Sequence, residues 1–255
     1  METVKAKKFL GQHFLKDEHI AERIARSLSG KESRLLEIGP GMGVLTKYLV
    51  DNPAIDFRCV EIDRESVAYL HEHYPTLQVV EGDFLKMDLN SLFHDSFAII
   101  GNFPYNISSQ ILFRVFDHRN LIPEVVGMFQ KEVAERVAAA PGSKIYGILS
   151  VLLSAFYNIE YLFTVDEHVF NPPPKVKSAV IRLTRNNVTS LECDEKLFVQ
   201  TVKVGFNQRR KTMRNALKPM GRDLSDIPET LLQKRAEQLS VADFILITNR
   251  LKETL

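Results

Sequence analysis

The stretch Arg34-Leu35-Leu36-Glu37-Ile38-Gly39-Pro40-Gly41-Met42-Gly43 decides the fold. It begins as a short apolar strand and ends in three glycines at alternate positions, and the apolar residues of 44–49 predict the start of a helix. A strand, a glycine turn and a helix make up the first unit of a nucleotide-binding α/β sheet, where glycines let the backbone approach a ligand closely.

The second strand supplies an acidic residue at an informative spacing. Segment 57–60 predicts a strand that ends at Glu61, and Glu61 follows Gly39 at about the interval at which an acidic residue contacts a ribose. Val44 stands where a dinucleotide fingerprint has its third glycine. The turn therefore favours a ligand with an adenosine and no pyrophosphate, and S-adenosylmethionine is the candidate. The alternative is a plain β–α connection that binds nothing.

Outward from this unit, the apolar pattern predicts the rest of an α/β sheet. Helices are expected at 64–74, after Ser108, at 131–139 and at 146–156, and further strands are expected at 77–80, 97–102, 125–129, 159–165 and 179–183. Together with the first two strands, this gives a Rossmann-like sheet of about seven strands.

Two more strand ends carry polar groups. Asp83 follows the third strand and is placed to accept from an adenine amino group, although a turn aspartate is the simpler interpretation. The fourth strand runs into Asn102-Phe103-Pro104-Tyr105. Pro104 fixes its own φ and pushes Phe103 toward an extended conformation. Because ligands sit at the carboxyl ends of strands in such a sheet, the loop holds an amide, a carbonyl and a ring beside a ligand.

This loop suits the exocyclic amine of a flat ring, such as N6 of adenine. That nitrogen is a poor nucleophile because its lone pair is delocalised into the ring. The side-chain oxygen of Asn102 and the carbonyl of Phe103 are acceptors that would pull the amine toward tetrahedral geometry, and the Tyr105 ring would stack on the base. The alternative is a strand-end turn with a core tyrosine. Phe170, before the stiff loop Asn171-Pro172-Pro173-Pro174, is either a core residue or a second stacking wall.

Both ends of the chain carry basic residues. The N-terminal arm, residues 1–16, has Lys5, Lys7 and Lys8 interleaved with aromatic residues, and it either contacts phosphates or is a solvated terminus. The polar segment 185–190 predicts a boundary between a catalytic domain, 1–186, and a helical domain, 191–255.

The helical domain is expected to have three helical stretches and no strand. Its first helix is predicted to place Arg210, Arg214 and Lys218 on one face, at i, i+4 and i+8, with no acidic residue among them. Such surfaces suit phosphate backbones, although a solvated face is the alternative. RNA contact is expected from Arg209, Arg210, Lys211, Arg214 and Lys218.

Composition bounds the class of protein. The chain has 255 residues, 45% of them hydrophobic and 25% charged, and its net charge of +1 says nothing about partners. Cys59 and Cys193 are too few for a disulfide framework or a cysteine metal site. The N-terminus is charged and no apolar run approaches membrane-spanning length. We expect a cytoplasmic protein without a metal and without a membrane partner.

Taken in order, the motifs resemble those of the rRNA adenine dimethylase family, specifically the bacterial small-subunit rRNA adenine N6-dimethyltransferases. The resemblance covers nearly the whole chain, and the order and spacing of the motifs make it specific. The motifs are Gly11-Gln12-His13-Phe14-Leu15, Glu37-Ile38-Gly39-Pro40-Gly41, Glu61-Ile62-Asp63, Gly82-Asp83, Asn102-Phe103-Pro104-Tyr105, Phe170-Asn171-Pro172-Pro173-Pro174-Lys175-Val176 and Phe206-Asn207-Gln208-Arg209-Arg210-Lys211.

The resemblance implies a seven-stranded class I methyltransferase domain that binds S-adenosylmethionine, followed by a small all-α domain. The residues that it places at the cofactor are His13, Leu15, Gly39, Glu61, Asp83 and Asn102. Glu61 would hold the ribose hydroxyls, and Asp83 would read the cofactor adenine. The family usually has Leu or Ile where this chain has Phe103, and because that position acts through its carbonyl, we expect activity to survive.

The resemblance further implies dimethylation of N6 on two adjacent adenines, in a hairpin loop near the 3′ end of 16S rRNA within the 30S subunit. We expect the protein to be a monomer. The target base would leave its stack and lie between Tyr105 and Phe170. The catalytic residues would be Asn102, Phe103, Pro104, Tyr105 and Phe170.

Three other functions are weighed against this one. A 23S rRNA adenine methyltransferase of the macrolide-resistance type would share the catalytic domain, but the basic segment and the triple-proline loop favour the small-subunit enzymes. A non-enzymatic ribosome assembly factor is disfavoured by the intact Glu61, Asp83 and Asn102. A DNA adenine methyltransferase would need a larger target-recognition domain.

Overall fold

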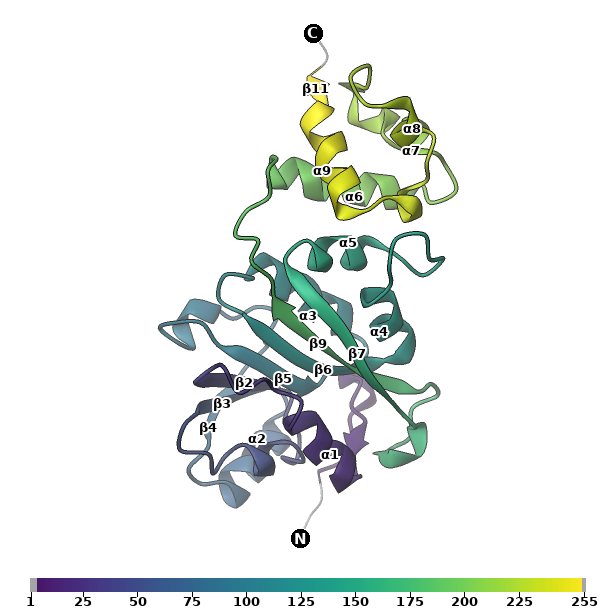
Figure 1. Cartoon of the computed structure of the whole chain (residues 1–255). Helices are drawn as coiled ribbons and strands as arrows, with labels where there is room; N and C mark the ends of the chain where they lie inside the picture. The colour runs from purple at the N-terminus through teal and green to yellow at the C-terminus, as the bar shows by residue number, and fades with distance from the viewer. Residues whose placement is uncertain (1–3, 254–255) are drawn as a thin grey trace. The chain divides into compact units, whose positions relative to one another are not determined.

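The computed structural model describes residues 4–253, so the first three residues of the predicted arm and the last two of the predicted helical domain lie outside it. The chain forms two compact units (Figure 1). The first unit extends to Ala134 and also takes Ile159–Arg185, and the second takes Glu135–Asn158 and the chain from Asn186 onward. Segment 135–158, which the predicted boundaries assign to the catalytic domain, thus belongs to the same unit as the C-terminal helices. The boundaries at 186 and 191 stay a prediction.

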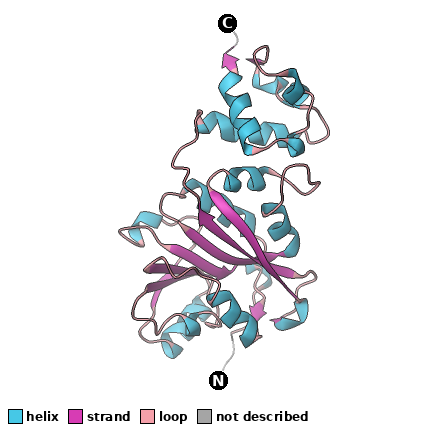
Figure 2. Ribbon diagram, in the orientation of Figure 1, coloured by secondary structure: helices cyan, strands magenta, loops and turns pink. Residues whose placement is uncertain are grey.

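The central sheet has the expected seven strands, in the order β4-β3-β2-β5-β6-β9-β7 (magenta in Figure 2). Strands β2 to β6 pair in parallel, and β9 runs antiparallel to β6. The strands are β2 (Arg34–Ile38), β3 (Asp56–Glu61), β4 (Gln78–Glu81), β5 (Ala98–Asn102), β6 (Glu124–Gln130), β7 (Tyr157–Val165) and β9 (Ser178–Arg185). The inner strands are buried along nearly their whole length, which is why they form continuous apolar runs in the sequence. The predicted fold class is confirmed.

Helices cover both faces of this sheet. In Figure 1, α1 (Glu18–Ala25) and α2 (Arg64–His73) lie on one face and α3 (Ser108–Asp117) lies on the other. Asp17 and Asp63 cap α1 and α2, because each carboxylate accepts from a backbone N–H of the first turn. A fourth helix, α4 (Lys131–Val137), follows β6 directly.

The predicted helix after Gly43 is not formed. Residues 41–50 make turns around a single 3-10 helix, η2 (Thr46–Tyr48). The segment is short, contains the β-branched residues Val44 and Thr46, and is followed by Pro53, all of which disfavour an α-helix. Thr46 is instead buried, and its hydroxyl donates to Glu37 at the end of β2.

A short ribbon joins the N-terminal arm to the loop before β9. Strand β1 (Phe14–Leu15) pairs antiparallel with β8 (Phe170–Asn171). The N–H of Lys16 donates to the carbonyl of Val169 at 2.8 Å, next to the 3-10 helix η4 (Glu167–Val169). The 3-10 helix η1 (Lys8–Leu10) precedes the ribbon. Two motifs that are far apart in the sequence therefore lie side by side.

The second unit is helical, with a small exception. Its helices within the described residues are α5 (Ile148–Ser154), α6 (Glu195–Asn207), α7 (Met213–Ala216), α8 (Glu229–Leu232) and α9 (Val241–Arg250), with 3-10 helices η5 (Lys218–Met220) and η6 (Ala236–Gln238). The prediction of no strand is wrong, because β10 (Arg222–Asp223) pairs with β11 (Lys252–Glu253).

The prediction that one helix carries Arg210, Arg214 and Lys218 is also wrong, because α6 ends at Asn207. A turn follows, and the N–H of Met213 donates to the carbonyl of Lys234 at 2.8 Å. Met213 packs against Gly205, where an added Cβ would lie 3.2 Å from its terminal methyl carbon. This packing folds the chain back on α6, so Arg210, Arg214 and Lys218 do not share a helix face.

Candidate active site

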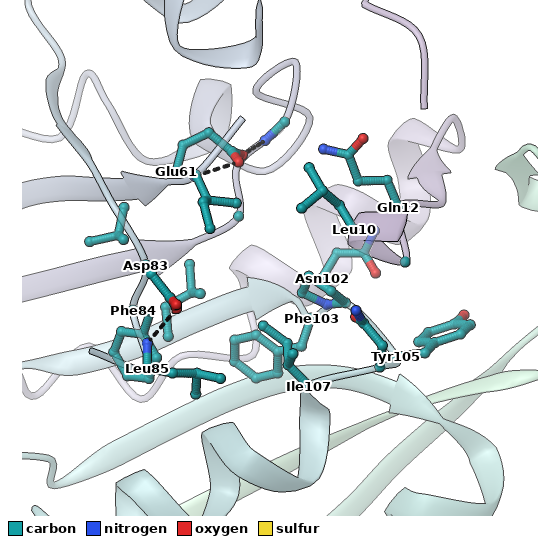
Figure 3. A pocket seen from close by; sticks show the side chains of 18 of the residues that line it. Leu10, Gln12, Glu61, Asp83, Phe84, Leu85, Asn102, Phe103, Tyr105 and Ile107 are labelled. Carbon is teal, nitrogen blue, oxygen red and sulfur yellow. Dashed lines mark hydrogen bonds between the residues drawn. The ribbon is translucent and has the colours of Figure 1, made fainter. Parts of the chain in front are cut away.

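A hollow opens at the carboxyl ends of β2, β3, β4 and β5 (Figure 3). Of the six residues predicted at the cofactor, five line it: His13, Gly39, Glu61, Asp83 and Asn102. Leu15 does not line it, because its side chain is buried in the core beside β8 and borders a neighbouring cavity instead. In Figure 3, Glu61 and Asp83 face Leu10 and Asn102 across the hollow.

Glu61 ends β3 with its carboxylate held by backbone groups. Oε1 accepts from the N–H of Ile62 at 2.8 Å and of Asp63 at 2.9 Å, and Oε2 accepts from the N–H of Gly41 at 3.0 Å. Burial raises the pKa of Glu61, and these three hydrogen bonds oppose the rise. A carboxylate has about four acceptor positions, so Oε2 keeps room for one more donor such as a ribose hydroxyl.

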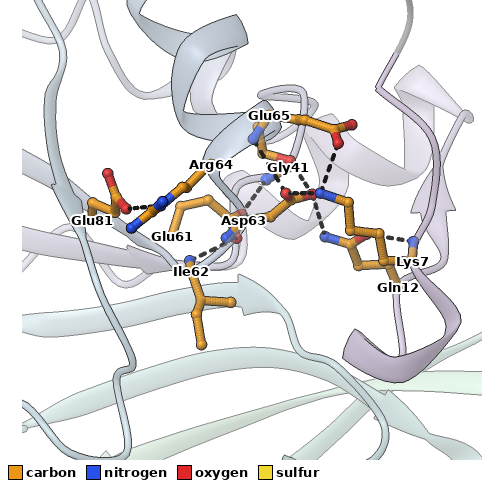
Figure 4. A network of polar contacts seen from close by, with 10 residues as sticks. Lys7, Gln12, Gly41, Glu61, Ile62, Asp63, Arg64, Glu65 and Glu81 are labelled. Atoms are coloured by element: carbon orange, nitrogen blue, oxygen red, sulfur yellow. Dashed lines mark hydrogen bonds and ion pairs between the residues drawn. The ribbon is translucent and has the colours of Figure 1, made fainter.

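The strand end after Glu61 also fixes the N-terminal arm (Figure 4). Lys7 Nζ lies 2.5 Å from Asp63 Oδ1 and 3.0 Å from Glu65 Oε1. The side-chain amide of Gln12 donates to Asp63 Oδ2 at 3.2 Å and its oxygen accepts from the N–H of Lys7 at 2.8 Å. Burial alone would raise the pKa of Asp63, but the hydrogen bonds from Lys7 and Gln12 outweigh it and lower the pKa.

Asp83 lies in the turn after β4 and is partly exposed in the hollow. Its Oδ1 accepts from the N–H of Leu85 at 2.9 Å, so the carboxylate is also a turn residue, as the simpler interpretation held. The apolar side chains of Ile62, Phe84 and Leu85 line the same part of the hollow. A flat ring fits between such side chains, with Asp83 beside its edge.

Asn102 ends β5 with its amide orientation fixed. Nδ2 donates to the carbonyl of His13 at 2.9 Å, which leaves Oδ1 as the acceptor that faces the hollow. The N–H of Phe103 donates to the carbonyl of Met128 at 3.2 Å, and no residue among 4–253 donates to the carbonyl of Phe103. The loop thus offers two acceptors whose hydrogen-bonding positions are open.

The ring of Phe103 is seated in a slot made by two glycines. Gly101 of β5 pairs with Gly127 of β6, and an added Cβ would lie 2.6 Å from the Phe103 ring at Gly101 and 2.3 Å from it at Gly127. The ring also packs against Phe129, with centroids 5.0 Å apart. The ring at position 103 is therefore accommodated because these two positions of the sheet carry no side chain.

Tyr105 stacks on His13 in this structure, with ring centroids 5.2 Å apart and planes at 28°. The hydroxyl of Tyr105 lies 2.5 Å from Oγ of Ser178, and Nδ1 of His13 lies 2.8 Å from the carbonyl oxygen of Pro172. Burial raises the pKa of Tyr105, although the Ser178 contact opposes it. The ring that faces Tyr105 thus belongs to the N-terminal arm.

Phe170 takes the core position, which is one of the two interpretations of this residue. Its side chain is 1% exposed and packs in the hydrophobic core with Leu15, its partner in the β1–β8 ribbon. It lines neither the hollow nor the cavity next to it. A stacking role for Phe170 stays a prediction, and it would require the ring to leave the core.

A second cavity, of about 440 Å³, adjoins the hollow and shares Gly11, Gln12, His13 and Tyr105 with it. Its other walls come from the N-terminal arm, the end of β6 and the triple-proline loop, namely Ala6, Lys8, Gln130, Pro172, Pro173, Pro174, Lys175 and Val176. Neither wall carries a carboxylate, whereas the hollow has two carboxylates and no Lys or Arg. The two compartments therefore suit ligands of opposite charge.

Glu37 lies buried at the end of β2, with 1% of its surface exposed. Burial raises its pKa to about 7, and the like charge of Glu61 adds to the rise. The Thr46 hydroxyl at 2.6 Å and the Cys59 thiol at 3.7 Å donate to Oε2 and oppose the rise in pKa. Sequence reasoning gave this glutamate no role beyond its motif.

The predicted RNA-binding residues are exposed on the second unit, in the turn after α6, in α7 and in η5. Arg209 is held by Glu237 at 3.0 Å and by the carbonyl of Tyr146 at 3.2 Å, and Arg214 pairs with Glu229. Arg210, Lys211 and Lys218 are exposed and form no ion pair with a described residue.

Comparisons with known proteins decide the family. The profile of the family described as ribosomal RNA adenine dimethylase matches residues 3–253. The chain is 61% identical to ribosomal RNA small subunit methyltransferase A of Cytophaga hutchinsonii, over 98% of this chain and 99% of that one. It is 58% identical to the protein of the same description from Bacteroides thetaiotaomicron, over 100% and 97%.

The chain belongs to the ribosomal RNA adenine dimethylase family. Among solved structures, a dimethyladenosine transferase from Plasmodium falciparum superposes with a TM-score of 0.77 at 27% identity, covering 92% of this chain and 96% of that one. The 23S rRNA methyltransferase ErmE gives 0.71 at 25% identity, with coverage of 93% and 99%. The chain is accordingly an rRNA adenine dimethyltransferase that uses S-adenosylmethionine.

The hollow fits this cofactor on physical grounds. Its lining has two carboxylates and no Lys or Arg, although Lys86 lies 3.5 Å from Asp83, so it suits a ligand that carries positive charge better than a pyrophosphate. Gly39 and Gly41 have φ of 67° and 57°, and a Cβ at Gly41 would lie 2.8 Å from the Phe14 ring, so side chains there would narrow the hollow.

Residues 4–253 contain no group of three or more His, Cys, Asp or Glu side chains arranged to hold a metal ion. None of their helices is long and apolar enough to cross a membrane.

Proposed function

We propose that this chain dimethylates N6 of two adjacent adenines in a hairpin loop near the 3′ end of 16S rRNA, within the 30S subunit, as a cytoplasmic monomer. The small-subunit relatives, which are 58–61% identical over nearly their full length, support that choice of substrate over 23S rRNA. The reaction itself is supported most by one observation: Asn102 Oδ1 and the Phe103 carbonyl are open acceptors in the loop whose Tyr105 lines both the hollow and the second cavity.

The target adenine leaves its stack and enters the second cavity, where the Tyr105 ring stacks on it. Its amino group donates to Asn102 and to the carbonyl of Phe103, which frees the lone pair of N6. S-adenosylmethionine, when bound in the hollow, supplies an electrophilic methyl group. The proton that N6 loses passes to water, since the amine is acidic once methylated. The chain thus contributes positioning and oriented acceptors, which is where most of the rate of such a transfer arises.

Glu61 and Asp83 hold the adenosine part of the cofactor in this proposal. Glu61 takes a ribose hydroxyl at Oε2, and Asp83 takes the adenine amino group. Arg210, Lys211 and Lys218 contact phosphates of the rRNA, because they are exposed cations without an ion-pair partner among the described residues. Arg209 and Arg214 are already paired, so they contribute less.

Methyl transfer from labelled cofactor to unmethylated 30S subunits, 50S subunits and duplex DNA, run in parallel, tests the proposal. We expect label on 30S subunits alone, found as dimethyladenine in a hairpin-loop fragment of 16S rRNA by mass spectrometry. Label on 50S subunits would favour the 23S enzyme, and label on none would favour an assembly factor. The molar mass measured by light scattering at several protein concentrations tests whether the protein is a monomer.

A further inference from the structure

The turn η1 (Lys8–Leu10) presents an aromatic ring to solvent. Phe9 is 77% exposed, and the next most exposed large apolar side chain of the described residues, Ile62, is 50% exposed and lines the hollow. Single exposed apolar residues are common on protein surfaces. Phe9 therefore needs a second observation before it indicates a site, and its surroundings supply two.

The first observation is that the turn is held on two sides by contacts with other segments. The N–H of Gly11 donates to the carbonyl of Lys8 at 3.1 Å, and Gly11 has a φ of 66° that closes the turn. The amide of Asn106 donates to the carbonyl of Phe9 at 3.4 Å, and a Cβ on Gly11 would lie 2.5 Å from Asn106 Oδ1. On the other side, Lys7 is tied to Asp63 (Figure 4). The ring thus projects from a fixed backbone, at little further entropic cost on binding.

The second observation is where the turn lies. Lys8 lines the second cavity and Leu10 lines the hollow, so the backbone of Phe9 links a residue of one compartment to a residue of the other. Lys175 and Val176, from the triple-proline loop, line the second cavity as well, and Val176 is also exposed. Lys8 and Lys175 form no ion pair with a described residue, and no carboxylate lines the cavity. The mouth of the second cavity, formed by Lys8, Phe9 and Lys175, therefore combines a fixed ring with two cations that have no carboxylate partner among the described residues.

We propose that this mouth is a binding site for the nucleotide next to the target adenine. Phe9 stacks on the neighbouring base, and Lys8 and Lys175 hold the phosphates that flank the target nucleotide. Aromatic rings beside cations are the usual means of holding single-stranded nucleic acid. An extruded adenine leaves one face of its neighbour uncovered, and Phe9 covers that face. This inference rests on the proposed function, because it takes the second cavity as the adenine site.

Substitutions at Phe9 test the stacking, with kcat/KM measured on unmethylated 30S subunits. We expect Phe9→Ala to lower kcat/KM about thirtyfold, mainly through KM, which is the middle of the range for one stacked base. Phe9→Trp should keep wild-type values, and Phe9→Leu should be as low as Phe9→Ala, since an apolar group without a π face cannot stack. Affinity for S-adenosylhomocysteine should not change. Tyr161→Ala, an exposed aromatic on β7, is the matched control and should behave as wild type.

Salt dependence tests the two lysines. For single strands, the logarithm of affinity falls with the logarithm of salt by roughly 0.7 per phosphate contacted. Lys8→Gln with Lys175→Gln should therefore lower the slope for 30S binding by about 1.4. Lys31→Gln with Lys196→Gln removes the same charge elsewhere on exposed positions and should leave the slope unchanged.

Two outcomes overturn the inference while leaving the proposed function in place. In both, the wild-type chain methylates 30S subunits. In the first outcome, Phe9→Ala keeps the wild-type kcat/KM. In the second, Phe9→Ala lowers kcat/KM but Phe9→Leu keeps the wild-type value. The second result would assign Phe9 to an apolar contact with ribosomal protein. A wild-type chain inactive on 30S subunits would overturn the proposed function, and this inference with it.

Discussion

The loop Asn102–Tyr105 and the basic segment 208–218 are both expected to contact rRNA, but they are built in opposite ways. The loop is uncharged, and its groups are held by buried strands and by the N-terminal arm. The basic segment carries its charges on exposed turns and short helices, with two of its arginines in ion pairs. Methyl transfer requires groups held at fixed positions, as in the loop. Electrostatic attraction of a phosphate backbone tolerates charges on exposed side chains, as in the basic segment. Single substitutions should therefore have large effects in the loop and small effects in the segment.

The largest effect is expected for Asn102→Ala. It removes an acceptor that acts mainly in the transition state, so kcat should fall at least about a hundredfold. Affinity for S-adenosylhomocysteine, measured by calorimetry, should fall much less. Asn90→Ala, at an exposed position, is the control. Turnover near wild type at saturating cofactor would mean that N6 is activated elsewhere.

The pH dependence of stability gives the next largest effect, at the end of β2. Glu37 has a folded-state pKa of about 7 against an ordinary value of 4.5, because it is buried. Between these values the unfolded chain binds fewer protons than the folded chain, so the free energy of unfolding falls as pH rises, by roughly 3 kcal/mol in total. Below pH 4.5 and above about pH 7, Glu37 adds nothing to the change of unfolding free energy with pH.

Urea unfolding at several pH values measures this slope. Glu37→Gln should remove most of the fall between pH 4.5 and 7. Thr46→Val removes the hydroxyl that stabilises the ionised carboxylate, so it should extend the fall to higher pH. A Glu37→Gln chain with the wild-type slope would exclude Glu37 as its source.

Gly127→Ala tests how the loop is seated. The new methyl group would lie 2.3 Å from the Phe103 ring and 2.6 Å from the Phe129 ring, so we expect a loss of about 1–3 kcal/mol in unfolding free energy. Turnover should fall too, because displacement of the Phe103 ring moves its carbonyl. Adding Phe103→Leu should restore part of both. Gly147→Ala, where the nearest side-chain atom is 3.7 Å from the new Cβ, is the control. Equal effects at both glycines would argue against the slot.

The strand-end features were predictable because their causes are local. Parallel strands buried on both faces leave apolar runs, as in β5 and β6, and the chemistry follows at their carboxyl ends. Glu61, Asp83 and Asn102 therefore line one hollow, as their spacing predicted. The phenylalanine at position 103, where the family usually has Leu or Ile, is accommodated beside Gly101 and Gly127. Only the register of β5 on β6 reveals that these two glycines are neighbours.

Other features depend on contacts between distant segments, which one sequence does not reveal. Gln12 and Asp63 both belong to quoted motifs, yet nothing in the spacing indicates that they meet. The stacking of His13 on Tyr105 depends on the β1–β8 ribbon in the same way. The break after Asn207 depends on Met213 packing against Gly205, so a helical apolar pattern predicted a continuous helix where the chain turns back.

The smallest effect is expected in the basic segment, from single substitutions at Arg210 and Arg214. Arg210 forms no ion pair with a described residue, so Arg210→Gln should reduce the salt slope of 30S binding by roughly 0.7–0.9, the value of one phosphate contact. Arg214 is paired with Glu229, so Arg214→Gln should change the slope less, and Glu229→Gln should raise it by freeing the arginine. Thermal stability should change little in each case, since an exposed ion pair contributes about 0–1 kcal/mol.

Binding to 30S subunits, measured at several salt concentrations, should give the order Glu229→Gln, wild type, Arg214→Gln, Arg210→Gln from the steepest salt slope to the shallowest. An equal slope in all four would mean that rRNA is contacted through other residues, and the opposite order for the two arginines would mean that the ion pair breaks on the ribosome.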